Sequence, residues 1–231
     1  METIHIQSFV SAPPQAVWDS LMGRPDVVLD ALPVQAWPDQ REESVPSRLM
    51  VRWPFSSGGT PTTSVAISLA EVSGGTRIDL KHEGWHEEPG WQDAIAGHFA
   101  GWLQAVAALG LLVESGKDPR ASSAVLGGKE RYFASAEMPA GADAVFRSLA
   151  DPDVRARWSD GALDEAELTE SLEGRFLRFA LPQETGPGEL VVILRRTPRG
   201  THCALAEYGV TDRSASARWP KLLERLSRFL R

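Results

Sequence analysis

The chain has 231 residues, of which 42% are hydrophobic and 24% are charged, an ordinary composition for a globular protein. Its net charge of −7 argues against the basic surface that nucleic-acid binding requires. The only cysteine, Cys203, cannot form an internal disulfide, so we expect a reducing compartment, the cytoplasm.

The first half of the chain predicts a sheet that is followed by one long helix. Alternation of apolar and polar residues marks the strands, and apolar residues at helical spacing mark the helices. The expected elements are a strand over Thr3–Val10, a helix over Pro13–Gly23 with a short second helix after it, strands near Arg48–Phe55, Thr62–Val72 and Thr76–Glu83, and a closing helix near Gly90–Glu114.

Within the third of those later strands, His82-Glu83-Gly84-Trp85-His86 spells H-E-x-x-H, the zinc-protease pattern. The pattern needs a helix, on which both histidines share one face and bind one metal ion. Here Ile78, Leu80 and His82 alternate with polar residues, which is typical of a strand. We therefore expect no metal site and no protease.

A polar segment that is rich in glycine and serine, Ser115–Glu130, predicts a linker. The expected domains are 1–115 and 129–231, joined by residues 116–128. The second half predicts a helix near Gly141–Ala150, strands near Ala162–Leu172, Gly174–Leu181, Glu189–Arg196 and Thr201–Val210, and a closing helix over Ser214–Arg231.

Three matches in the same order indicate that the second half repeats the first. "AVWDSL" (Ala16 to Leu21) matches "AVFRSL" (Ala144 to Leu149), and "GTRIDLKHEGW" matches "GTHCALAEYGV". The third match is in the closing helices, where apolar residues recur at spacings of 4, 3 and 4 and so share one face. These residues are Trp102, Val106, Leu109 and Val113 in one helix, and Trp219, Leu223, Leu226 and Leu230 in the other.

The motifs "FVSAPPQAVWDSL" and "LKHEGW", with the Trp102 helix after them, resemble the START-like (SRPBCC) superfamily. The similarity is greatest to bacterial homologues of the activator of heat-shock-protein ATPase, relatives of polyketide cyclases. The resemblance implies an α+β fold with two tandem helix-grip domains, each a curved antiparallel sheet around a long C-terminal helix. It also implies an apolar cavity between sheet and helix.

Polar residues on the concave face are the candidates for function. His82 and Glu207 occupy equivalent positions in the repeat, and neighbouring apolar residues place both toward the closing helix. Each either anchors a ligand in the cavity or is hydrogen-bonded within a filled core. The expected cavity lining is Trp53, Phe55, His82, His98, Trp102, Glu207 and Trp219.

We therefore expect a non-enzymatic protein that binds a small apolar ligand or a protein partner, without a cofactor or a membrane. The longest apolar-rich run, Gly101–Val113, is too short to span a bilayer. The first alternative is a polyketide cyclase-like enzyme, with His82 or Glu207 as acid or base. The second is a co-factor of a chaperone ATPase, which the resemblance alone implies.

Overall fold

The computed structural model describes residues 3–30, 32, 36–54, 62–85, 91–120, 131–182, 188–209 and 215–231. The chain forms two compact units, Met1–Asp118 (unit 1) and Pro119–Arg231 (unit 2). Phe55, His86 and residues 121–130 of the expected linker lie outside the described residues.

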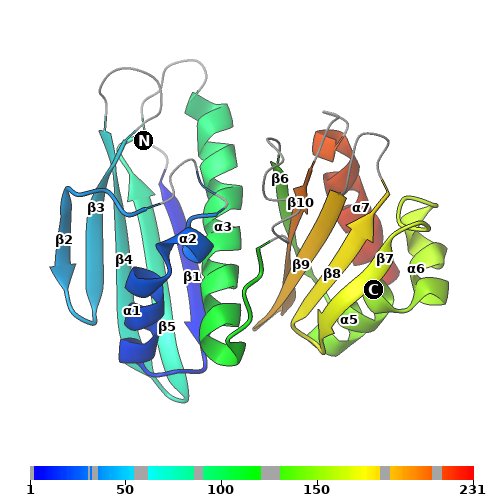
Figure 1. Ribbon diagram of the computed structural model, residues 1–231, viewed down its shortest axis with the longest axis horizontal. Coiled ribbons are helices and arrows are strands. Elements are labelled where there is room, and N and C mark those ends of the chain that lie inside the picture. Colours follow the sequence, from blue (N-terminus) through cyan, green and yellow to red (C-terminus); the bar gives the residue numbers. More distant parts are fainter. Residues whose placement is uncertain are drawn as a thin grey trace. The chain divides into compact units, whose positions relative to one another are not determined.

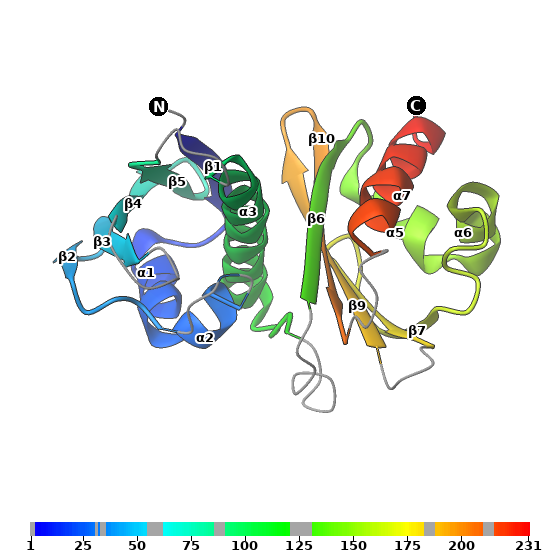
Figure 2. The same ribbon diagram turned by 90° about the horizontal axis from the view of Figure 1, so that it is seen from above.

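Unit 1 is a five-stranded antiparallel sheet with a long helix on its concave side (Figures 1 and 2). Its strands follow the spatial order β1-β5-β4-β3-β2. Along the chain the elements are β1 (Ile4–Val10), α1 (Pro14–Gly23), α2 (Pro25–Val28), β2 (Arg41–Ser44), β3 (Arg48–Pro54), β4 (Thr62–Val72), β5 (Gly75–Glu83) and α3 (Trp91–Ser115).

Unit 2 repeats this topology, with the strand order β6-β10-β9-β8-β7. Its elements are β6 (Arg131–Met138), α5 (Ala142–Ala150), α6 (Pro152–Ser159), β7 (Glu167–Leu172), β8 (Phe176–Leu181), β9 (Gly188–Thr197), β10 (Gly200–Tyr208) and α7 (Ala215–Phe229). The expected α+β fold with two helix grips is thereby confirmed.

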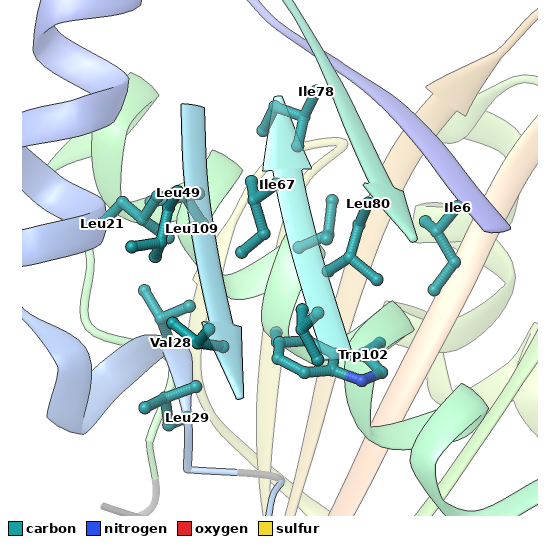
Figure 3. Close-up of a cluster of buried hydrophobic side chains, with 14 of the residues drawn as sticks. Ile6, Leu21, Val28, Leu29, Leu49, Ile67, Ile78, Leu80, Trp102 and Leu109 are labelled. Carbon is teal, nitrogen blue, oxygen red and sulfur yellow. The ribbon is translucent and has the colours of Figure 1, made fainter. Parts of the chain in front are cut away.

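The core of unit 1 lies between the sheet and its three helices, as Figure 3 shows. Ile78 and Leu80 of β5 are buried, whereas Arg77 and Lys81 on either side of them are exposed, because successive side chains of a strand point to opposite faces. From α3, Trp102, Val106 and Leu109 face the same core at helical spacing.

Two short contacts explain why the sequence "Gly-Thr" recurs at the start of β5 and of β10. A Cβ atom on Gly75 would lie 2.1 Å from the carbonyl oxygen of Val10, and one on Gly200 would lie 2.1 Å from that of Met138. The threonine that follows each glycine donates a 2.7 Å hydrogen bond from its hydroxyl to a backbone carbonyl, Ala12 for Thr76 and Ala140 for Thr201. The repeat therefore preserves a close approach between the end of the first strand and the start of the last one in each unit.

The sequence prediction was wrong at two places in the sheets. The expected strand over Ala162–Leu172 begins only at Glu167, because residues before it form turns after α6. Strand β2 was missed, since all four of its residues, Arg-Glu-Glu-Ser, are exposed and show no alternation.

The apolar stretch of α3 is longer than the run seen in the sequence. Over Ala94–Ser115 the helix is long and apolar enough to cross a membrane, with a mean hydropathy of 1.5. However, 56% of the most apolar window is buried within the protein, and Trp102, Val106 and Leu109 belong to the core of unit 1. The composition of α3 is thus that of a core helix.

Candidate functional site

The imidazole of His82 is fully buried on the concave face of β5, and both of its nitrogens are hydrogen-bonded. The indole Nε1–H of Trp102 donates to Nδ1 at 3.0 Å, and Nε2 lies 2.7 Å from the hydroxyl oxygen of Thr63. An indole nitrogen can only donate, so Nδ1 must accept and the proton of the neutral ring sits on Nε2. The ring therefore donates from Nε2 to Thr63.

The hydrogen bonds continue past the ring. The Thr63 hydroxyl donates to the backbone carbonyl of Trp53 at 3.4 Å. Burial and, to a smaller extent, the nearby His98 lower the pKa of His82 to about 3. At neutral pH His82 is thus an uncharged link between helix α3 and strand β4, with both nitrogens bonded to protein groups.

Five aromatic side chains surround this link, and together with His82 we call them the aromatic cluster. His82 lies 4.3 Å from Trp85 and 5.3 Å from His98, between ring centroids. Trp53 and Trp102 are 5.1 Å apart, and Trp85 and Trp91 are 5.8 Å apart. The cluster consists of Trp53, His82, Trp85, Trp91, His98 and Trp102.

Two members of the cluster differ from the rest. His98 is half-buried, so it forms the solvent edge of the cluster; it donates from Nδ1 to the Ala94 carbonyl at 2.9 Å, and burial lowers its pKa. Trp53 is fully buried, yet its indole Nε1 has no hydrogen-bond partner among the described residues. By contrast, Trp85 donates its Nε1–H to the His82 carbonyl at 3.0 Å.

In unit 2, Glu207 of β10 takes the place of His82. Its side chain is buried, and its two oxygens accept from Arg218 Nη2 at 2.6 Å and from Trp219 Nε1 at 2.5 Å. The Arg218 guanidinium also lies over the Trp219 ring, 4.9 Å from the centroid, and remains partly exposed. The carboxylate is thus held by one charge-assisted bond and one indole bond.

The structure therefore brings most of the predicted residues together in two equivalent pairs. In each unit, a polar residue of the last strand accepts the indole N–H of a tryptophan on the closing helix: His82 with Trp102, and Glu207 with Trp219. We call each an acceptor–indole pair. Trp53 and His98 join the pair of unit 1, and Phe55 lies outside the described residues.

Two partners were missed by the sequence analysis. Thr63 is buried on the same face of the sheet as Val65, which pairs directly with His82, so the strand alternation already carried a signal for it. Arg218 lies on α7 with 40% of its side chain exposed, and its guanidinium forms an ion pair with the buried Glu207. No sequence signal pointed it at Glu207.

His82 and Glu83 of the H-E-x-x-H pattern lie on a strand, whereas a zinc-protease site needs a helix. His82 is buried and Glu83 is exposed, on opposite faces of β5, and both His82 nitrogens are in use. Over the described ranges, no group of three His, Cys, Asp or Glu residues could hold a metal ion.

We therefore expect the purified protein to contain no stoichiometric zinc. Elemental analysis after dialysis against dilute zinc should give well under one ion per chain, and His86→Ala should leave that value unchanged. One tightly held zinc ion that disappears in His86→Ala would contradict this.

The two units are helix grips, each a curved antiparallel sheet around a long C-terminal helix. No protein-family model and no curated protein matches the sequence.

Several solved structures are similar to this chain in fold. DynU16, a protein in the dynemicin biosynthetic locus, aligns with 100% of this chain and 96% of its own, at 18% identity and a TM-score of 0.45. The di-domain ARO/CYC StfQ from the steffimycin biosynthetic pathway aligns with 98% of this chain and 97% of its own, at 10% identity and a TM-score of 0.37. Aha1 from Colwellia psychrerythraea covers 51% of this chain and 99% of its own, at 16% identity and a TM-score of 0.39.

Proposed function

We propose that this protein is a non-enzymatic binding protein, and that unit 1 takes a small, planar, apolar ligand at the aromatic cluster. The observation that carries the proposal is the cluster itself, in which four tryptophans and two histidines lie within ring contact of one another. Ligand sites are built mainly from apolar and aromatic side chains with a few polar groups that fix orientation.

The burial and hydrogen bonding of His82 and Glu207 support ligand binding rather than acid–base catalysis. A general base must reach a proton of the substrate, directly or through one water molecule. His82 is neutral, fully buried and bonded at both nitrogens, and Glu207 is buried with both oxygens bonded. Neither has a free atom to offer a substrate, so the cyclase alternative has less support.

The distribution of exposed apolar residues bears on the protein-partner alternative. The large exposed apolar side chains among the described residues are Phe9, Val45, Phe99 and Phe229, and each belongs to a different element or turn. Single exposed apolar residues are ordinary, whereas a docking surface needs a contiguous patch. A small ligand in unit 1 is the better-supported occupant.

His98 gives the proposal a direct test. It forms the solvent edge of the cluster, so His98→Glu would place a carboxylate beside the ligand, where an unpaired charge is costly to bury. We expect the wild-type protein to bind 2-ethylnaphthalene saturably, one per chain, and His98→Glu to weaken the binding by about tenfold or more. Equilibrium dialysis measures both, and tryptophan fluorescence reports the contact.

The matched control is His5→Glu, which makes the same change at an exposed position of β1, outside the cluster. It should bind the probe as the wild type does. Absence of saturable binding to the wild type, or equal affinity in His98→Glu, would remove the proposal.

A further inference from the structure

The buried indole N–H of Trp53 lacks the hydrogen bond that neighbouring tryptophans make, among the residues that the structure describes. The indole N–H groups of Trp37, Trp85 and Trp102 in unit 1 each donate to a protein acceptor at 2.9–3.0 Å. The Trp53 indole is equally buried, but its N–H has no partner among the described residues. A buried donor without an acceptor costs about 1–3 kcal/mol, and native proteins rarely leave one so.

The position of this donor indicates what would satisfy it. The Trp53 ring lies 5.1 Å from Trp102 and 6.1 Å from His82, inside the aromatic cluster. Its nearest polar neighbours are already committed, since Thr63 bonds His82 and the Trp53 carbonyl, and Trp102 bonds His82. An acceptor that belongs to a bound ligand would complete the set.

We infer that the ligand of unit 1 is electrically neutral and carries a hydrogen-bond acceptor, such as a carbonyl oxygen, which takes the indole N–H of Trp53; this rests on the proposed function. A cation has no lone pair for the indole. An anion would be buried without a counter-charge, because the six members of the cluster include no Lys or Arg and neither histidine is protonated at neutral pH.

The burial of the aromatic cluster also determines how a ligand can reach Trp53. Trp53, His82 and Trp102 have no exposed surface, so the acceptor reaches Trp53 only when side chains at the solvent edge rotate away. His98 is the half-buried member and the first that would move. Binding is therefore coupled to a change of conformation in the cluster.

Two probes of nearly equal shape test the inference. 2-Acetylnaphthalene has a carbonyl oxygen that 2-ethylnaphthalene lacks. With the 231-residue chain we expect the ketone to bind about 3- to 10-fold more tightly, as one additional buried hydrogen bond implies. In Trp53→Phe this preference should vanish, so that the ketone and the hydrocarbon bind with equal affinity. The control Trp158→Phe, in unit 2, should keep the preference.

Each outcome separates the two proposals. If neither probe binds the wild type, the proposed function fails. If both probes bind equally, the Trp53 N–H donates to a water molecule or to nothing, and the inference alone fails. The inference also fails if the preference for the ketone survives in Trp53→Phe. It fails as well if the anion 2-naphthoate binds as tightly as the ketone. Should Trp53→Phe not fold, the infrared C=O band of the bound ketone decides, since a hydrogen bond lowers its frequency and an apolar contact does not.

Discussion

Replacing His82 by leucine is expected to lower the free energy of unfolding by about 2–4 kcal/mol at pH 7, because two buried groups lose a partner. The Trp102 N–H would be left without an acceptor and the Thr63 hydroxyl without a donor. Urea denaturation, followed by far-ultraviolet circular dichroism, measures the change. The control His5→Leu, at an exposed position, should shift stability by less than about 0.5 kcal/mol.

The stability of the wild type and that of His82→Leu should depend differently on pH. Unfolded histidine has a pKa near 6.5, whereas that of His82 in the folded protein is about 3. Between these values the unfolded chain binds a proton that the folded chain does not, so the free energy of unfolding falls as the pH is lowered. Below pH 3 the loss from this group amounts to about 4–5 kcal/mol.

Since His82→Leu lacks this group, its stability should fall less on acidification, and its deficit relative to the wild type should shrink between pH 6.5 and pH 4. Above pH 6.5 the deficit should be constant. A deficit that stays constant or grows as the pH falls would show that His82 is protonated in the folded protein.

In unit 2, Glu207→Leu is expected to cost about 1–3 kcal/mol, because the buried Trp219 N–H loses its acceptor while Arg218 regains water. Glu207→Gln keeps an acceptor oxygen and should cost less. Thermal and urea unfolding measure both, with Glu224→Gln, at an exposed ion pair of α7, as the neutral control. An unchanged or higher stability of Glu207→Leu would mean that Trp219 finds another acceptor.

The fold could be predicted largely from local patterns. Alternation over Thr62–Val72 and over Gly75–Glu83 determines which residues face the core, and this requires no knowledge of the partner strands. The spacing of Trp102, Val106 and Leu109 does the same for α3. Strand β2 could not be found in this way, because an exposed edge strand gains nothing from alternation and is held by backbone pairing with β3 alone.

The sequence predicts on which face of the sheet the candidate site residues lie, but not which atoms they contact. Alternation placed His82 and Glu207 toward the closing helix, yet which atoms they meet depends on how the helix crosses the sheet. Thr63 reaches His82 because the β4–β5 register sets Val65 opposite His82 and leaves Thr63 diagonal to it on the same face. Register and crossing angle arise from packing across the whole unit, which no single stretch of sequence specifies.

The two acceptor–indole pairs also describe how the halves of a duplicated chain can diverge. The buried tryptophan needs a hydrogen-bond acceptor for its indole N–H. The last strand can supply this acceptor as a neutral imidazole or as a carboxylate. Unit 1 has the neutral solution, and no buried residue of its described part carries a charge at neutral pH, whereas unit 2 has the charged one, with Arg218 beside it. The same geometry is thus present in both units while the electrostatic character at the two pairs differs, so that one unit can suit the uncharged ligand proposed above without a change in the other.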